Sequence, residues 1–446
     1  MRIKLISPRM SLRPMDSEFK RRMSPPLSLL TLAALIPDHQ VYIEDENTGG
    51  INLNDTPDLV GITVSVDTAN RAYRISDHYR QKGVKVILGG IHVSANPQEG
   101  LEHADSVCIG EAEGVFRRIV NDAQSNRLER LYYNQTPTSP QEIPIPCKKL
   151  INESSYLYTN ILYSSRGCPH KCEFCYNSNS FVHRQYRNRP VENIITEIKG
   201  FDRKQAMFID DNFIGNPQKS LLLINELSNL NITWHAAVST DLLNHPNIMD
   251  RMSQSGCRSL FIGFESISEQ SINSVNKKQN TISRYETLIK ELHDRDIMVN
   301  ASIALGFDYD SKNVFRDTLN WLVSNKVETM TAHILTPYPG TILYKKMLEQ
   351  NRIIDFNYDK YNTANVVYKP ALMTPEELKK GYLWLYKNFY SIKTILKRMP
   401  DSKKQRLPYF MFNLFYRKFG KIVSVIGKTG LMNKLGIIGS RLSYDI

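Results

Sequence analysis

The stretch Cys168-Pro169-His170-Lys171-Cys172-Glu173-Phe174-Cys175 places three cysteines within eight residues, separated by three and then by two residues. Three thiolates on one tight loop can bind three irons of a four-iron, four-sulfur cluster and leave the fourth iron open to a small molecule. A structural cluster or a structural zinc site normally takes four protein ligands. The loop therefore predicts a metal site with one open coordination position.

The cysteine loop follows the first of six short apolar segments that alternate with amphipathic helix patterns. The predicted strands are residues 161–164, 206–209, 234–238, 260–264, 298–305 and 329–335, and the predicted helices include 190–199, 220–230, 282–293 and 314–322. Six β/α units are fewer than the eight of a closed barrel. We therefore expect a partial (β/α)6 TIM-type barrel with the cysteine loop at its catalytic edge.

The amino-terminal part shows a second alternation of strand and helix patterns. Strands are predicted at residues 4–6, 41–43, 59–66, 84–88 and 106–109, and helices at 27–36 and 68–82. This order predicts a doubly wound, Rossmann-like α/β domain whose ligand lies at the carboxyl ends of the strands. The residues expected there are Ser65, Gly89, Gly90, Gly110 and Glu111, the last two at the start of the next helix.

A polar segment with four prolines, residues 126–153, separates the two alternating parts. We predict domains at 1–140 and 154–365, followed by a mainly helical, basic and aromatic region at 366–446. That last region is interpreted either as a lid over a large apolar or anionic molecule, or as a tail packed on the barrel or resting on a membrane surface.

The composition limits the function classes. The 446 residues include six cysteines, too few for a disulfide framework. There are 57 basic and 45 acidic residues, and the excess lies between Lys379 and Arg441 and at Arg184, Arg187 and Arg189. A solvated basic face or a pocket for an anionic substrate is favoured over a nucleic-acid or membrane-surface patch. Neither a signal peptide nor a membrane span is predicted, so the cytoplasm is the expected location.

The cysteine spacing, with Phe174 before the last cysteine, resembles the motif of radical S-adenosylmethionine (SAM) enzymes. The resemblance implies that Cys168, Cys172 and Cys175 hold a 4Fe-4S cluster whose open iron binds SAM. It implies further SAM contacts after the second to fifth barrel strands, at Asp210, Asp211, Asn212, Ser239, Asp241, Glu265 and Gly306. Two alternatives stay open: helix capping by residues 210–212, and a zinc knuckle completed by His170, His183 or a distant cysteine.

The amino-terminal part resembles the cobalamin-binding domain that is fused to many radical SAM enzymes. In the motif Asp45-Glu46-Asn47-Thr48-Gly49-Gly50, Asn47 stands where that fold has its cobalt-binding histidine. The resemblance therefore implies cobalamin without a protein histidine below the cobalt. His92 is interpreted as a packing residue, and a flavodoxin-like domain without a ligand is the alternative.

Residues 208–216, 262–266 and 277–280 resemble the branch that contains hopanoid C-methylases and the anaerobic oxidative cyclase of bacteriochlorophyll synthesis. The resemblance implies a C-methyltransferase that acts on an unactivated carbon of a small-molecule or lipid-like substrate, with an electron donor such as flavodoxin or ferredoxin. A cyclase or rearrangement enzyme with the same cofactors is the second interpretation. A zinc-dependent nucleic-acid-binding protein is the third interpretation. Under either enzyme interpretation no nucleic-acid partner is expected. Any peripheral membrane contact is expected through the basic tail.

Overall fold

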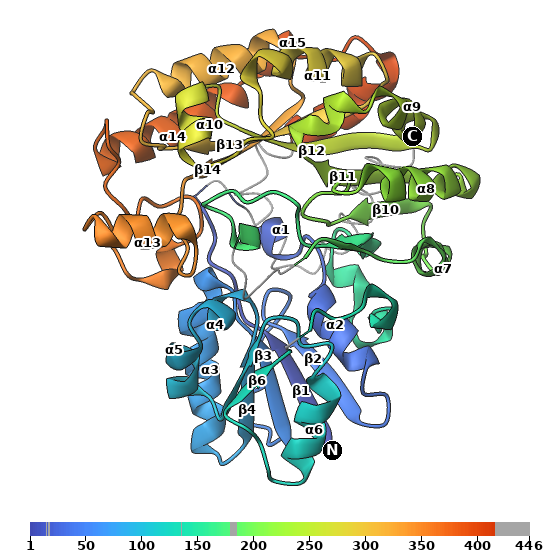
Figure 1. The fold of residues 1–446 in the computed structure, drawn as a ribbon, viewed down its shortest axis with the longest axis vertical. Helices are drawn as coiled ribbons and strands as arrows, with labels where there is room; N and C mark the ends of the chain where they lie inside the picture. The colour runs from blue at the N-terminus through green and yellow to red at the C-terminus, as the bar shows by residue number, and fades with distance from the viewer. Residues whose placement is uncertain (15, 17, 135, 179–184, 415–446) are drawn as a thin grey trace.

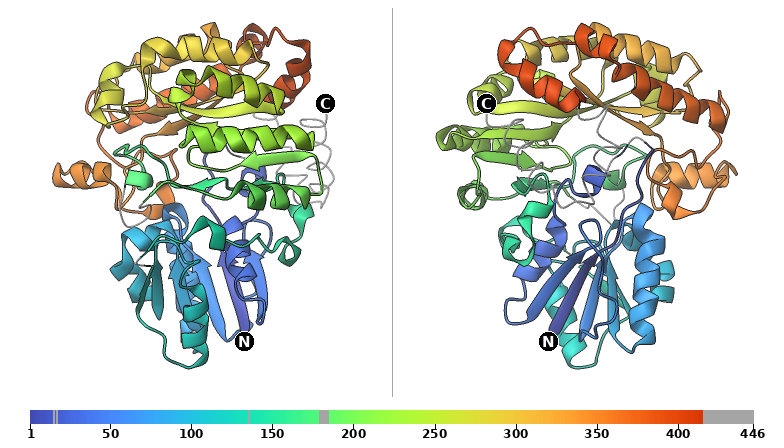
Figure 2. Two further views of the ribbon diagram at one scale, coloured as in Figure 1. Left: turned by 45° about the vertical axis from the view of Figure 1, so that its right-hand side comes forward. Right: turned by 180° about the vertical axis from the view of Figure 1, so that it is seen from behind.

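The computed structural model describes residues 1–14, 16, 18–134, 136–178 and 185–414. It consists of two α/β lobes, an amino-terminal lobe and a barrel lobe, with helices from the carboxy-terminal region packed on the latter (Figures 1 and 2). Figure 1 places the amino terminus at the end of the lower sheet that lies away from the barrel lobe. The carboxyl ends of the strands that run parallel to β1 therefore face the barrel lobe.

The amino-terminal lobe is built on a parallel sheet, which confirms the predicted doubly wound architecture. In the described residues this sheet has six strands in the order β2-β1-β3-β4-β5-β6. The strands are β1 (Arg2–Ser7), β2 (Gln40–Asp45), β3 (Leu59–Thr63), β4 (Lys85–Gly89), β5 (Ser106–Ile109) and β6 (Leu131–Tyr133). The helices are α2 (Leu27–Ala34), α3 (Ala69–Gln81), α4 (Ile91–Ala95), α5 (Pro97–His103) and α6 (Phe116–Gln124).

Three local predictions for this lobe were wrong. Strand β3 ends at Thr63, and Ser65 instead begins the 3-10 helix η1 (Val66–Thr68). Helix α6 begins at Phe116, so Gly110 and Glu111 lie in the preceding turn. Part of the predicted connector forms β6, which pairs with β5 because a short Leu-Tyr-Tyr run completes the sheet edge.

The barrel lobe contains the predicted second parallel sheet. Its described strands number six, in the order β14-β13-β12-β11-β10-β7. They are β7 (Ile161–Leu162), β10 (Gln205–Phe208), β11 (Thr233–Val238), β12 (Cys257–Glu265), β13 (Met298–Leu305) and β14 (Thr329–Ile334). The outer helices are α7 (Val191–Lys199), α8 (Pro217–Leu227), α9 (Pro246–Gln254), α10 (Glu269–Ser274), α11 (Tyr285–His293), α12 (Val314–Ser324) and α13 (Ile342–Glu349). The sheet does not close, because β7 and β14 are not paired with each other.

Helix α14 (Pro375–Phe389) covers the open edge at β14. The hydroxyl of Tyr386 accepts from the backbone N–H of Ala332 and donates to its carbonyl, both at 3.0 Å. Tyr390 bonds both backbone groups of Met330 in the same way. Side chains of the helix thus satisfy an edge strand that has, among the described strands, no neighbour on that side. This part of the carboxy-terminal region is packed on the barrel, which was one of the two predicted alternatives. Helix α15 (Ile392–Lys397) follows it. Residues 415–446 of the predicted basic tail lie outside the described residues.

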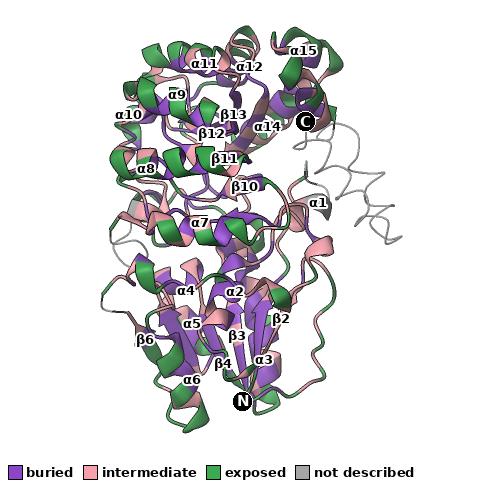
Figure 3. Cartoon of the chain, turned by 90° about the vertical axis from the view of Figure 1, so that its right-hand side faces the viewer, coloured by how far each residue is buried: buried purple, intermediate pink, exposed green. Residues whose placement is uncertain are grey.

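Buried residues follow both sheets, and exposed residues follow the outer helix faces (Figure 3). In the barrel lobe Phe208 and Phe213 pack against Trp234, with ring centroids 5.2–5.8 Å from the tryptophan. One amino-terminal segment leaves its own lobe: Arg13, ahead of helix α1 (Glu18–Arg21), bonds Thr363 at 3.2 Å and lies 3.3 Å from His333 of β14. In the described part of the chain, no helix is long and apolar enough to span a bilayer.

Candidate functional site

The cysteine loop projects from a two-stranded antiparallel ribbon, β8 (Ser165–Arg166) and β9 (Arg187–Asn188). Residues 275–279 hold it from the side. Glu173 N–H donates to the Val275 carbonyl at 3.0 Å, the Asn276 amide donates to the Lys171 carbonyl at 3.1 Å, and the Gln279 amide lies 3.5 Å from Cys172 Sγ. The sequence singled out residues 277–280 only through a resemblance, so their contact with the loop is new information.

The three thiols lie in a largely desolvated loop. Burial raises the pKa of Cys168 to about 11 and that of Cys175 to about 12. Cys175 N–H donates to the Cys172 carbonyl at 3.0 Å, which sets the turn between these two cysteines. Among the described residues, no three His, Cys, Asp or Glu side chains converge on one ion position. The donor set still fits a four-iron cluster, since each thiolate there binds a different iron.

Asp210 is not free to contact a ligand, although it was predicted at the SAM site. Its carboxylate is buried and accepts bonds from Ser164 N–H at 3.1 Å, from Ser164 Oγ at 2.8 Å and from Ser165 Oγ. Burial raises the pKa of this carboxyl. Asp210 therefore ties β10 to the strand before the cysteine loop. The capping alternative for residues 210–212 is wrong, because Asn216 caps α8.

Asn212, Ser239 and Asp241 form one hydrogen-bonded chain that reaches the cysteine loop. The Asn212 amide donates to Ser239 Oγ at 2.8 Å, and Ser239 Oγ donates to Asp241. His170 Nε2 lies 3.4 Å from both Ser239 Oγ and Asp241 Oδ2. Burial alone would raise the pKa of Asp241, but bonds from His170 and Ser239 hold it below the usual value. His170 thus faces Asp241; His183, the other histidine considered for zinc, lies outside the described residues.

Asp211 and Glu265 complete this rim of the barrel. Asp211 is exposed, and its charge acts on both Cys168 and Cys175. Glu265 has a left-handed backbone, with φ of 63°, and ends β12 beside Lys277 with 3.3 Å between carboxylate and ammonium. Ser302 Oγ donates to the second carboxylate oxygen at 3.2 Å. The structure therefore gathers Asp211, the Asn212 chain and Glu265 around one loop.

Gly306 lies at the same edge, in a turn with φ of 96°. A Cβ there would meet the Tyr368 hydroxyl at 2.4 Å and the Leu378 side chain at 2.6 Å. Its N–H donates to Asp310 at 2.8 Å, and its carbonyl accepts from Tyr368. Packing against the carboxy-terminal region accounts for glycine at this position.

The predicted residues of the amino-terminal lobe form a separate group. Gly89, Gly90, Gly110 and Glu111 line a cavity of about 220 Å³, whereas Ser65 does not. Its lining includes the apolar residues Leu29, Ile62, Ile87 and Phe116 and the polar residues Thr63, Ser94, Glu113 and Arg166. A mainly apolar lining with a few polar groups suits an aromatic ring that carries polar substituents. The residues present thus fit the nucleotide tail of a corrinoid.

Several of these residues have local partners that the sequence did not indicate. A Cβ at Gly90 would come within 2.8 Å of the Val64 backbone, so packing alone requires glycine there. Ser65 Oγ donates to Asp67 at 2.8 Å. The Asn47 amide donates to Asp45 at 2.7 Å, and its oxygen accepts from Met10 N–H at 3.0 Å. His92 is buried against Tyr358 and Glu99, which agrees with a packing role.

The two groups meet where the lobes touch. Arg166 at the base of the cysteine loop lies 2.6 Å from Glu113, and Arg187 of β9 is paired with Glu111, so the Glu111 carboxylate is already bonded. Tyr176, directly after Cys175, packs in one apolar cluster with Val66 of η1. These contacts join residues far apart in sequence, and no local pattern indicates them.

Comparison with known proteins agrees with this arrangement. The family model of the radical SAM superfamily matches residues 162–322, and that of the B12 binding domain matches residues 25–120. The chain thus joins a B12-binding domain to a radical SAM domain, as the sequence predicted.

Relatives over most of the chain include methyltransferases and cyclases. Bacteriochlorophyllide d C-12(1)-methyltransferase of Chlorobaculum tepidum is 28% identical, with coverage of 89% of this chain and 90% of the relative. Hopanoid C-2 methylase of Rhodopseudomonas palustris is 25% identical over 77% of this chain and 67% of its own. The anaerobic magnesium-protoporphyrin IX monomethyl ester cyclase of Rubrivivax gelatinosus is 24% identical over 80% and 70%. The predicted resemblance to these groups is confirmed.

Solved structures share the whole architecture. The radical SAM methyltransferase TsrM from Kitasatospora setae, determined with cobalamin and a [4Fe-4S] cluster bound, superposes with a TM-score of 0.67 at 13% identity. The superposition covers 98% of this chain and 99% of TsrM. At this identity the likeness concerns the fold, and it confirms the order of an amino-terminal α/β lobe, a partial barrel and a helical carboxy-terminal region.

Proposed function

We propose that this chain, which joins a radical SAM domain to a B12-binding domain, is a C-methyltransferase acting on an unactivated carbon of a small molecule. One observation carries the proposal: Tyr176, next to Cys175, packs against an apolar cluster that contains Val66 of η1, the 3-10 helix that follows β3. The cysteine loop therefore lies against the carboxyl edge of the sheet in the other lobe. Groups bound at the two places would face one common space.

In this proposal Cys168, Cys172 and Cys175 hold a 4Fe-4S cluster, and SAM lies on the rim beside it. Asp211 is the candidate for the SAM amino group, because it is exposed and its charge acts on Cys168 and Cys175. The chain Asn212–Ser239–Asp241 and the Glu265–Lys277 pair offer hydrogen-bonding groups for the carboxylate and ribose. Asp210 takes a supporting role, since three serine donors occupy its carboxylate.

Cobalamin is assigned to the amino-terminal lobe, with its tail in the cavity beside Gly89, Gly90 and Gly110. Ser65 and Asp67 lie on the loop that faces Tyr176, and Asp67 is close enough for its charge to act on the Tyr176 hydroxyl. Asn47 keeps its amide on Asp45 and Met10, so we assign it no cobalt contact. When bound, the cluster with SAM supplies a hydrogen-abstracting radical, and cobalamin supplies the methyl group.

The chain's own residues orient these groups and exclude water from the space between them. The ion pairs of Arg166 with Glu113 and of Arg187 with Glu111 fix the lobes next to the cysteine loop. The apolar cluster of Val66, Tyr361 and Val367, with Tyr176 and Tyr338 against it, removes water from one side of the gap. A dry site protects a radical from side reactions. A reduced flavodoxin or ferredoxin is proposed as the electron donor.

A second candidate keeps both cofactors but replaces methyl transfer with cyclisation. It is favoured by one observation, the presence of anaerobic cyclases among relatives that cover most of this chain. The products separate the two: S-adenosylhomocysteine accompanies 5′-deoxyadenosine only when a methyl group is transferred.

The test is anaerobic reconstitution of the full chain with iron, sulfide and hydroxocobalamin, followed by SAM and dithionite. We expect about four irons per chain, one bound cobalamin and formation of 5′-deoxyadenosine. Cys172→Ala should lose the iron and the deoxyadenosine, whereas the matched variant Cys147→Ala, in the amino-terminal lobe, should keep both. Iron retained by Cys172→Ala, or stoichiometric zinc without deoxyadenosine, would overturn the proposal.

A further inference from the structure

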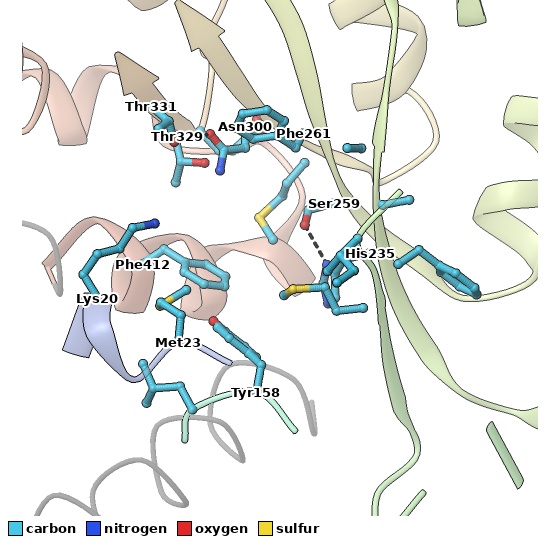
Figure 4. A pocket seen from close by; sticks show the side chains of 18 of the residues that line it. Lys20, Met23, Tyr158, His235, Ser259, Phe261, Asn300, Thr329, Thr331 and Phe412 are labelled. Carbon is cyan, nitrogen blue, oxygen red and sulfur yellow. Dashed lines mark hydrogen bonds between the residues drawn. The ribbon is translucent and has the colours of Figure 1, made fainter. Parts of the chain in front are cut away.

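A cavity of about 470 Å³ occupies the interior of the partial barrel. Inward side chains of β10 to β14 line it, among them His235, Ser259, Phe261 and Thr331, and Lys20 of α1 closes it from the side (Figure 4). In a closed barrel, layers of side chains fill this volume. Here the volume falls within the roughly 300–1,000 Å³ of small-molecule sites. The cavity reaches Asp210 after β10, while its lining residues from β12 to β14 lie in the first halves of these strands.

Most ionisable groups around the cavity are already paired. Arg13 donates to Asp16 at 3.0 Å. Glu328 accepts from Val299 N–H at 2.9 Å and lies 3.1 Å from His293 Nε2. Asp210 is bonded by serines, as described above. Each of these three carboxylates thus has hydrogen-bond or ion-pair partners of its own.

His235 contributes a neutral polar group. Its Nδ1 lies 2.6 Å from Ser259 Oγ, drawn as the dashed line in Figure 4. Burial lowers the pKa of His235 to about 3, and the charge of Arg258 acts in the same direction. The imidazole is therefore uncharged at neutral pH.

Lys20 is the exception. In Figure 4 its side chain extends from α1 toward the side of the cavity that holds Thr329. Within the described residues, the Lys20 ammonium forms no ion pair. The charge of Asp16 acts on it, and the Asp16 carboxylate itself is bonded to Arg13. Burial lowers the pKa of Lys20, and the charge of Arg13 lowers it further. Among the described residues, Arg13 and Lys20 are thus two basic side chains beside one carboxylate, that of Asp16.

We propose that the barrel cavity binds a largely apolar small molecule with one carboxylate group, which pairs with Lys20. The inference goes beyond the proposed function and does not depend on it, since the lining residues of β12 to β14 lie at the starts of these strands. Phe261, Met298 and Phe412 supply the apolar walls. An anion at Lys20 would match a cation that is otherwise costly to desolvate.

The test compares two probes that share a ring and a chain, 1-pyrenebutyrate and the uncharged 1-pyrenebutanol. Binding to the purified full chain is followed by pyrene fluorescence at pH 7.5. We expect the carboxylate to bind at least about tenfold more tightly than the alcohol, because a charged hydrogen bond forms away from water. In Lys20→Met and Lys20→Gln this preference should vanish, and in Lys20→Arg it should persist.

Two further variants locate the probes. Thr331→Phe narrows the cavity and should weaken both probes, whereas Lys290→Met, which removes an exposed lysine paired with Asp294 on α11, should change neither. Equal affinity for both probes in the native chain, a preference that survives in both neutral Lys20 variants, or unchanged binding in Thr331→Phe would each overturn the proposal. Because no turnover is measured, these outcomes are independent of whether SAM is cleaved or a methyl group transferred.

Discussion

The ring of Tyr176 stacks on the ring of Tyr338, with centroids 5.4 Å apart and planes 24° from parallel. Tyr176 directly follows Cys175, and Tyr338 lies in the turn after β14, so the pair joins the two ends of the open barrel. Both rings pack against the apolar cluster of Val66, from the amino-terminal lobe, with Tyr361 and Val367. A single aromatic contact therefore links the cysteine loop, the far strand and the neighbouring lobe.

The Tyr176 hydroxyl is buried and, among the described residues, has no hydrogen-bond partner. A buried unpaired hydroxyl costs about 1–3 kcal/mol. We therefore expect Tyr176→Phe to raise the free energy of unfolding of the cofactor-free chain by about 1 kcal/mol, measured by urea denaturation. Tyr285→Phe is the matched control, because its buried hydroxyl donates to the Phe264 carbonyl at 2.9 Å and should cost stability when removed. A loss of stability in Tyr176→Phe would contradict this account.

The Glu265–Lys277 pair is a second buried feature of the rim, with side chains only 12% and 9% exposed. Lys277→Met would leave the carboxylate without its cation, which typically costs about 3–5 kcal/mol. Glu265→Gln in the same chain should recover most of that loss, since a neutral amide replaces the stranded charge. Urea unfolding of the two single variants and the double variant measures the coupling. If the losses simply add, the pair is not coupled.

The sequence was sufficient for those features that depend on local patterns. Apolar segments of strand length recur between amphipathic helices, and this recurrence predicted every strand of the two sheets except β6 within a few residues at each end. The three cysteines were identifiable because their ligand chemistry is contained in eight adjacent residues. Ser65 was misplaced at a strand end because apolar Val64 and Val66 extend the hydrophobic run beyond Thr63, while the backbone turns into η1.

The remainder of the site depends on contacts between distant residues. Asp210 was predicted at the SAM site by its position after β10, but Ser164 and Ser165, about 45 residues earlier, bind its carboxylate. Lys20 carries no local signal of a role, because only the folded chain brings α1 to the wall of the barrel. Such pairings follow from tertiary packing and leave no periodicity to detect.

Arg166 and Glu113 link the two lobes at 2.6 Å, with side chains 16% and 7% exposed. Glu113→Lys would bring two cations together in this shielded place and should lower the free energy of unfolding by about 3–5 kcal/mol. The exchange variant Arg166→Glu with Glu113→Lys should recover part of the loss, because opposite charges face each other again. Thermal or urea unfolding provides the measurement.

The control for this pair is Glu129→Lys, which breaks an exposed ion pair with Arg118. Exposed pairs contribute about 0–1 kcal/mol, so this variant should be nearly neutral. Equal losses at the two sites would mean that the interface pair is no better shielded than a surface pair.

Acid should destabilise the chain through His235. Burial lowers its pKa in the folded state from 6.5 to about 3, so the unfolded state binds the proton first as the pH falls. The stability that depends on neutral His235 is therefore complete above pH 6.5 and is lost as the pH falls toward 3. Between pH 6.5 and 5 the loss is about 2 kcal/mol, at about 1.4 kcal/mol per pH unit. His235→Gln should flatten the curve of unfolding free energy against pH by that amount, measured with urea at fixed ionic strength. His333, whose pKa burial also lowers to about 3, predicts the same flattening for His333→Gln and a larger one for the double variant. A pH profile in His235→Gln that runs parallel to that of the native chain would show that this imidazole titrates alike in the folded and unfolded states.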